Sequence, residues 1–123
     1  MEMMNRVAVI TGGSGGIGKA MAKAFLAEGA KAVVLADLNT DAVTAAAQEI
    51  GCAGKTCDVT NEAQIAALVN ETIAEYGKID LFCSNAGAGG SGLLTDAENE
   101  VWQMQWELHV MSHLYAARAV LPS

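Results

Sequence analysis

A glycine-rich turn lies between an apolar run and a segment with the pattern of a helix. The residues from Arg6 to Gly18 read RVAVITGGSGGIG. Backbone N–H groups at such a turn, together with the positive end of a helix dipole, form a binding site for phosphate. Gly13, Gly15 and Gly18 fit the spacing G-x-G-x-x-G. Because a strand is expected before the turn and a helix after it, this spacing predicts a site for the pyrophosphate of a dinucleotide.

The same turn also fits a tighter pattern, Thr11-Gly12-x-x-x-Gly16-x-Gly18. In this interpretation Gly12 permits the sharp turn and Gly16 lets the pyrophosphate approach the backbone. Gly18 lets the helix pack closely on the sheet. The contacts predicted for the turn are Thr11, Gly12, Ser14, Gly15, Gly16, Ile17 and Gly18.

An acidic residue follows a second apolar run about twenty residues farther along. Ala32–Ala36 predicts a buried strand, and Asp37 comes directly after it. A carboxylate at this place accepts hydrogen bonds from the ribose hydroxyls of an adenosine and repels a 2′-phosphate. Ser14, Leu38 and Asn39 carry no positive charge that a 2′-phosphate would need. We therefore predict NAD rather than NADP as the cofactor, with Asp37 and Leu38 in the site. The alternative for Asp37 is an exposed carboxylate at a strand end.

Two further motifs make the chain resemble the short-chain dehydrogenase/reductase family from Val7 to Pro122. Asp58-Val59-Thr60 follows the third expected strand, and Asn85-Ala86-Gly87 follows the fourth. Trp102 and the closing Ala119–Pro122 match the family's fourth helix. The resemblance implies an oxidoreductase that transfers a hydride between nicotinamide and an alcohol or carbonyl, and it leaves the substrate open.

The resemblance also assigns roles to these motifs. Asp58 would hydrogen-bond the adenine amino group, and the backbone of Val59 would lie near the adenine ring. Asn85, Ala86 and Gly87 would line the ribose and steady the central strand.

The groups that transfer protons in this family have no counterparts in the chain. The family uses a Ser on its fifth strand and a Tyr-x-x-x-Lys pair on its fifth helix, both beyond the last residue here. Four residues after Tyr76 and Tyr115 stand Asp80 and Ala119, and neither is a lysine. His109 holds the position of the family's catalytic Asn on the fourth helix. We therefore predict no catalytic residue, and no turnover by this chain alone.

Composition narrows the class of protein. The chain has 123 residues, 52% of them hydrophobic, and a net charge of −7. It shows no basic stripe for nucleic acid, no apolar run of the ~20 residues that span a membrane, and no signal peptide in its short, polar N-terminus. We expect a cytoplasmic protein with one domain, residues 1–123, which forms the N-terminal portion of a dinucleotide-binding fold and has neither nucleic acid nor membrane as partner.

Helical and strand patterns alternate four times, which requires parallel strands joined by right-handed crossovers. After the first strand, further strands are expected at Lys31–Ala36, Gly54–Cys57 and Ile79–Ser84, and helices at Gly16–Glu28, Asp41–Ile50, Asn61–Tyr76 and 97–121. The resemblance implies the strand order 3-2-1-4, with the cofactor at the switch between strands 1 and 4. The predicted fold is an α/β Rossmann-type doubly wound sheet of four parallel strands and four helices, incomplete relative to the family's seven strands.

Packing faces and ends follow from the periodicity of each helix. The first helix is expected to bury Ile17, Ala20, Met21, Ala24 and Phe25. Thr95 is predicted as N-cap of the fourth helix, with Glu98 completing a capping box. Gly87–Gly92, a second glycine cluster, is interpreted as a loop beside the nicotinamide rather than as a phosphate site.

The fourth helix carries two stripes. Val101, Met104, Leu108, Met111 and Tyr115 are expected to pack on the sheet. Trp102, Trp106, His109 and His113 form a second stripe, either exposed or buried in self-association, and the resemblance implies a homo-oligomer through helix 97–121. His109 and His113 have the spacing of metal ligands, but no third ligand is in view. Cys52 and Cys57 likewise lack partners, so no metal site is predicted.

Three hypotheses about function stay open. The chain is the NAD-binding portion of an oxidoreductase, whose alcohol or carbonyl substrate binds only to a full-length parent. Alternatively, it is a short protein that binds NAD without chemistry, or a remnant with no ligand.

Overall fold

Four parallel strands form one sheet in the order β3-β2-β1-β4. The structure is a computed structural model and describes residues 1–89, 92 and 94–122; the predicted loop Gly87–Gly92 therefore lies partly outside the described residues. The strands are β1 (Val7–Thr11), β2 (Ala32–Asp37), β3 (Ala53–Thr56) and β4 (Leu81–Cys83). Val9 of β1 pairs with Val34 of β2 and with Phe82 of β4. The predicted fold class and strand order are confirmed.

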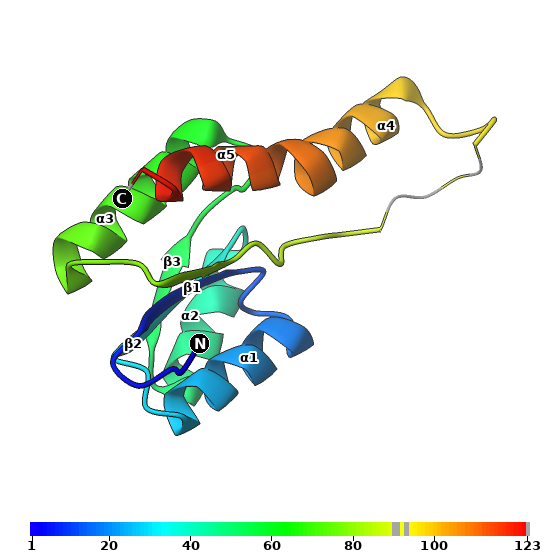
Figure 1. The fold of residues 1–123 in the computed structure, drawn as a ribbon. Helices are drawn as coiled ribbons and strands as arrows, with labels where there is room; N and C mark the ends of the chain where they lie inside the picture. The colour runs from blue at the N-terminus through cyan, green and yellow to red at the C-terminus, as the bar shows by residue number, and fades with distance from the viewer. Residues whose placement is uncertain (90–91, 93, 123) are drawn as a thin grey trace.

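Helices cover both faces of this sheet (Figure 1). On one face lie α1 (Gly16–Ala27) and α2 (Thr40–Ile50). On the other lie α3 (Glu62–Tyr76) and, beside it, α5 (Ser112–Val120), the last part of a helical rod that begins with α4 (Asn99–Trp106) and continues through the π-helical turn η1 (Glu107–Met111). No helix among the described residues is long and apolar enough to cross a bilayer.

The two central strands carry the core because both of their faces are covered. On the α3 side, Val9 and Val34 pack with Ile65 and Leu68. On the α1 and α2 side, Ile10, Val33 and Leu35 pack with side chains of those two helices. This burial explains why β1 and β2 appear in the sequence as unbroken apolar runs.

The face that α1 buries differs from the prediction. Gly18 and Ala22 are its buried residues, and Met21 and Phe25 are partly buried, whereas Ala20 and Ala24 are exposed and Ile17 is 70% exposed. The cause is the contact of Gly18 with the preceding turn, where a Cβ on Gly18 would lie 2.5 Å from the carbonyl oxygen of Gly12. Because of this close contact, Gly18 and Ala22 face the protein interior, and Ile17 and Ala24 do not.

The predicted start of the fourth helix is also wrong. The helix begins at Asn99, its N-cap is Glu98, and no side chain caps it. The Thr95 hydroxyl donates to Oδ1 of Asp96 at 3.3 Å, and its oxygen accepts no hydrogen bond from a helix N–H.

A π turn interrupts the fourth helix, which the sequence pattern did not reveal. The N–H of Ser112 donates to the carbonyl of Glu107, five residues back. The Ser112 hydroxyl donates to the carbonyl of Leu108 at 2.5 Å. A wider turn adds a residue to the helix, so the stripes predicted on either side of it do not run straight. Ser112 and Ala116 are the buried residues of the C-terminal half, whereas Met104, predicted to pack on the sheet, is 54% exposed.

Candidate functional site

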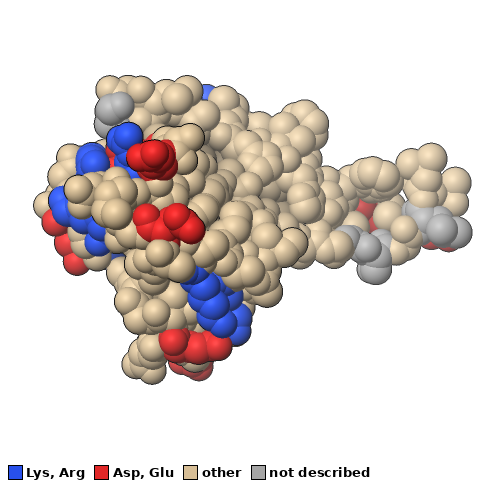
Figure 2. All heavy atoms as spheres, turned by 60° about the horizontal axis from the view of Figure 1, so that its bottom comes forward, with Lys and Arg blue, Asp and Glu red and all other residues tan. Residues whose placement is uncertain are grey.

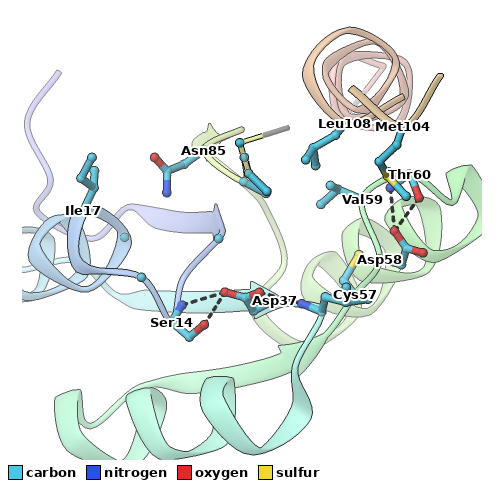
Figure 3. Close-up of a pocket in the computed structure, with 18 of the residues that line it drawn as sticks. Ser14, Ile17, Asp37, Cys57, Asp58, Val59, Thr60, Asn85, Met104 and Leu108 are labelled. Atoms are coloured by element: carbon cyan, nitrogen blue, oxygen red, sulfur yellow. Dashed lines mark hydrogen bonds between the residues drawn. The ribbon is translucent and has the colours of Figure 1, made fainter. Parts of the chain in front are cut away.

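A cavity of about 690 Å³ opens where the carboxyl ends of the strands meet the glycine turn (Figure 3). A volume of this size is typical of small-molecule sites. All of the predicted contact residues except Thr11 line it. These are Gly12, Ser14, Gly15, Gly16, Ile17, Gly18, Asp37, Leu38, Asp58, Val59, Asn85, Ala86 and Gly87. The structure therefore brings together motifs that lie up to 75 positions apart in the chain.

The glycine turn leaves room at its mouth. Gly12 has φ +66°, in the left-handed region. A Cβ on Gly13 would lie 2.7 Å from the Cβ of Leu35, so close packing on β2 requires the glycine. A Cβ on Gly16 would meet no atom within 4 Å. Gly16 begins α1, and the first N–H groups of a helix have no partners within it. The turn thus offers open space beside backbone donors, the arrangement that suits a phosphate.

Asp37 at the end of β2 faces this turn (Figure 3). Its Oδ2 accepts hydrogen bonds from the N–H of Ser14 at 3.1 Å and from the Ser14 hydroxyl. Its Oδ1 accepts from the N–H of Leu38 at 2.8 Å. The carbonyl of Asp37 accepts from the N–H of Cys57 at 2.8 Å. These contacts tie the end of β2 to the glycine turn and to the end of β3.

Asp58 shapes the opposite wall. Its Oδ1 accepts from the N–H and the hydroxyl of Thr60, at 3.0 and 2.6 Å. Its own N–H donates to Oε1 of Gln64 in α3 at 2.8 Å. Cys57 lines the floor, where burial first and the charge of Asp58 second raise the pKa of its thiol to about 11. The thiol is therefore protonated and neutral at physiological pH.

Thr11 acts from behind the cavity wall. It is buried, and its hydroxyl donates to the carbonyl of Cys83 at 3.3 Å. The hydroxyl oxygen accepts from the N–H groups of Asn85 at 2.9 Å and Ala86 at 3.1 Å. A Cβ on Gly12 would lie 2.9 Å from the Cα of Ala86. Thr11 and Gly12 thus hold the segment after β4 tightly against the turn.

The fourth helix supplies a wall that sequence reasoning missed. Met104, Gln105 and Leu108 line the cavity, as do Cys57, Thr60, Ala88 and Gly89. Figure 3 shows Met104 and Leu108 reaching from the helix toward Val59. Thr60 could have been predicted from the Asp58-Val59-Thr60 motif, whereas the helical residues carried no signal beyond their apolar spacing.

The two histidines of this helix are exposed, which is one of the two expectations for the second stripe, and each also contacts the segment after β4. Nε2 of His109 lies 2.9 Å from the carbonyl oxygen of Ala88. Nδ1 of His113 lies 2.6 Å from the hydroxyl oxygen of Ser84. Among the described residues, no group of three or more His, Cys, Asp and Glu side chains is placed to hold a metal ion. Trp102 and Trp106, the other members of the predicted stripe, are 49% and 54% exposed.

The cavity is acidic. Asp37 and Asp58 line it, and no lysine or arginine is among its described lining residues. Lys19, one residue after the turn, pairs with Glu49 at 3.2 Å. On the molecular face shown in Figure 2, basic side chains lie next to acidic ones. Backbone dipoles, rather than side-chain cations, are therefore what this site offers to an anion.

Known proteins are similar to this chain in sequence and in fold. The family model for short chain dehydrogenase matches residues 6–123. An uncharacterised oxidoreductase of Staphylococcus haemolyticus is 37% identical over 98% of this chain and 53% of its own length. Galactitol 2-dehydrogenase of Agrobacterium fabrum is 36% identical over 98% of this chain and 47% of its own.

A solved structure agrees with these matches. A short chain dehydrogenase/reductase from Burkholderia phymatum in complex with NAD superposes with a TM-score of 0.94 at 31% identity, covering 99% of this chain and 45% of that one. The chain spans about half the length of the proteins it matches.

Proposed function

Because the chain belongs to the short chain dehydrogenase family, we propose that its cavity binds NAD(H). The chain would be the cofactor-binding portion of an oxidoreductase that transfers a hydride between nicotinamide and an alcohol or carbonyl. The observation that carries this proposal is the convergence of the glycine turn, Asp37 and Asp58 on one cavity of about 690 Å³. The related structure from Burkholderia phymatum is a complex with NAD, which supports the same assignment.

The residues present fit a dinucleotide. The open space at Gly16, which a Cβ would fill, lies at the start of α1, where backbone N–H groups receive a pyrophosphate. Asp37 would accept hydrogen bonds from the adenosine ribose, and Asp58, with Val59, would hold the adenine. The bound nicotinamide supplies or accepts the hydride. The chain's own residues orient the cofactor, and the apolar side chains of Val59, Met104 and Leu108 line the cavity around it.

Preference for NAD over NADP follows from charge. Asp37 is held at the mouth of the turn by Ser14 and Leu38. A 2′-phosphate at that ribose would face this carboxylate, and no lysine or arginine among the described lining residues would offset the repulsion.

Neither of the two tyrosines in this chain is suited to proton transfer near neutral pH. A tyrosine that exchanges a proton with substrate near neutral pH needs a lowered pKa. Burial is the first cause that raises the pKa of Tyr76 and of Tyr115, and for Tyr115 the hydrogen bond to Glu107 raises it further. Both shifts run opposite to the catalytic requirement. We therefore propose that residues 1–123 bind the cofactor without turnover.

Self-association is a further part of the proposal. Trp102 and Trp106 expose about half of their surface on one side of the helix 97–121, which suits contact with a second copy. Light scattering on the Trp102→Glu/Trp106→Glu double variant should show a smaller particle than the unchanged chain. Equal particle masses for the double variant and the unchanged chain would rule out this interface.

A cytoplasmic location, expected from the sequence, is likewise a proposal. Fractionation of the cells that produce the protein tests it.

Titration with NADH tests the proposed function. The chain has two tryptophans, both on α4, and Met104, between them in sequence, lines the cavity. Saturable quenching of tryptophan emission, with sensitised NADH emission, is expected.

The titration and a mass measurement together separate the three hypotheses. A chain that binds NAD without belonging to an enzyme gives the same fluorescence signal, whereas a ligand-free remnant gives none. Intact mass of the natively produced protein separates the first two hypotheses, since a species near twice this mass identifies the enzyme portion.

A further inference from the structure

The segment that follows β4 is held from two sides. Thr11 of β1 binds the N–H groups of Asn85 and Ala86 from one side. On the other side, His113 contacts the Ser84 hydroxyl and His109 contacts the Ala88 carbonyl, at 2.6 and 2.9 Å. These two histidine contacts bracket Asn85–Gly87, which line the cavity.

We propose that His109 is a positioning residue, which together with His113 clamps the Ser84–Gly89 wall of the cavity in the shape that receives the dinucleotide. The expected effect of this clamp on dinucleotide binding rests on the proposed function. The histidine contacts themselves do not depend on it, because they are made within the chain. The wall needs such support because β4 has three residues and no helix or strand begins within Ser84–Gly89.

A local irregularity of the helix accompanies the contact of His109 with this wall. His109 lies inside the π turn Glu107–Met111, and π turns of this kind are frequent at functional sites. Ser112 stabilises the turn, because its N–H and its hydroxyl donate to the carbonyls of Glu107 and Leu108. Ser112 is buried beneath the turn.

Gly87 accommodates the histidine ring. A Cβ on Gly87 would lie 3.0 Å from Cε1 of His109, so the ring lies directly against the bare backbone. The clamp therefore combines a hydrogen bond at Ala88 with van der Waals contact at Gly87. Both contacts fall on residues that line the cavity.

The chemistry of the contact defines the substitutions that preserve it. A carbonyl oxygen only accepts hydrogen bonds, so Nε2 of His109 carries the proton and donates it. The amide nitrogen of glutamine reaches about as far along the side chain as this Nε2, whereas that of asparagine is one bond shorter. His109→Gln should therefore keep the clamp, and His109→Asn and His109→Ala should lose it.

The experiment compares these three variants with Val110→Ala, a control in the same π turn whose side chain is 42% exposed. Two quantities are measured on the full chain: hydrogen exchange of the backbone amides of 86–89, and the Kd for NADH. Loss of one such hydrogen bond should raise the Kd about three- to tenfold. For His109→Ala and His109→Asn we expect that increase and faster exchange, with His109→Gln and Val110→Ala within about twofold of the unchanged chain.

The outcomes separate the clamp from the proposed function. If the unchanged chain binds NADH and His109→Ala binds it equally well, with equal exchange, the clamp is refuted. A His109→Gln variant as weak as His109→Ala refutes it too, because a merely packed ring would explain both losses. If the unchanged chain does not bind NADH, the proposed function fails, and the exchange of 86–89 still decides for or against the clamp.

Discussion

Ser14 donates two hydrogen bonds to one carboxylate oxygen of Asp37, from its backbone N–H at 3.1 Å and from its hydroxyl. The two residues lie 23 positions apart and belong to the glycine turn and the end of β2. With the N–H of Leu38 on the other oxygen, the carboxylate is oriented before any ligand arrives. Preorganised acceptors lose less entropy on binding, which makes this pair the centre of ribose recognition in the proposed site.

Removing the Asp37 carboxylate should weaken the binding of NADH and reduce the preference for NADH over NADPH. Asp37→Ala deletes the carboxylate proposed to accept hydrogen bonds from the ribose hydroxyls, so the Kd for NADH should rise about 10- to 100-fold. The Kd for NADPH should rise less or fall, because the repulsion of the 2′-phosphate is gone. Calorimetry with both cofactors measures this, with Asp41→Asn, an exposed carboxylate of α2, as control. Unchanged affinities for both cofactors would remove Asp37 from the site.

Two glycines of the turn should respond in opposite ways. Gly16→Val places its side chain in open space, so the fold should be unchanged while NADH binding is lost. Gly18→Ala places a Cβ 2.5 Å from the carbonyl oxygen of Gly12, and should lower the free energy of unfolding by about 1–3 kcal/mol.

Urea unfolding and NADH titration of both variants check this pair. Ala20→Val, at an exposed position of the same helix, controls for placing a β-branched residue in α1. A Gly16→Val variant that still binds NADH would show that the phosphates lie elsewhere.

Thr11→Val should destabilise the end of β4 without changing the shape of the side chain much. The substitution removes the acceptor of the N–H groups of Asn85 and Ala86. Leaving such donors unpaired costs about 1–3 kcal/mol in the free energy of unfolding. Urea unfolding measures the loss, with the exposed Thr95→Val as a matched control. Equal losses in both variants would contradict the role given to Thr11.

Asp80 should make stability depend on pH in acid. The N–H of Val7 donates to its Oδ2 at 2.8 Å, and Lys78 and Arg6 form ion pairs with it. The hydrogen bond from Val7 is the first cause that lowers its pKa in the folded chain. A lowered folded pKa means that the stabilisation is present above the ordinary pKa near ~4 and is lost as pH falls through the folded value.

Asp80→Asn should therefore lower the Tm by about a few degrees at pH 7. The difference from the unchanged chain should shrink as pH is lowered past the folded pKa. Thermal unfolding followed by circular dichroism across this range measures it. A Tm difference that stays constant with pH would show that the charge of Asp80 does not contribute to stability.

The sequence predicted the strand order and the meeting of the main motifs at one cavity, because both depend on local patterns. Alternating strands and helices restrict the topology, and the glycine turn, Asp37 and Asp58 lie at strand ends, which parallel pairing brings to one edge. The predicted helix ends at Ile50 and Tyr76 were equally local, because each is followed by a glycine, Gly51 or Gly77, that has positive φ in the structure. Where a residue type decides the conformation of its own position, the sequence was sufficient.

Features that depend on packing between distant segments were missed. The buried face of α1 follows from the contact of Gly18 with Gly12, which simple periodicity did not include. The π turn depends on Ser112 being buried and donating to Leu108, and serine has no strong preference that would reveal it. His109 lies within this turn, and its contact with the carbonyl of Ala88 is equally absent from the sequence pattern.

The measurement that tests the central claim most directly is a crystal structure of the chain grown with NAD. The account predicts electron density for the pyrophosphate beside Gly16 at the start of α1, and for the adenosine ribose on the carboxylate of Asp37. A glycine turn filled by the protein's own side chains, or a dinucleotide bound away from Asp37, would contradict it.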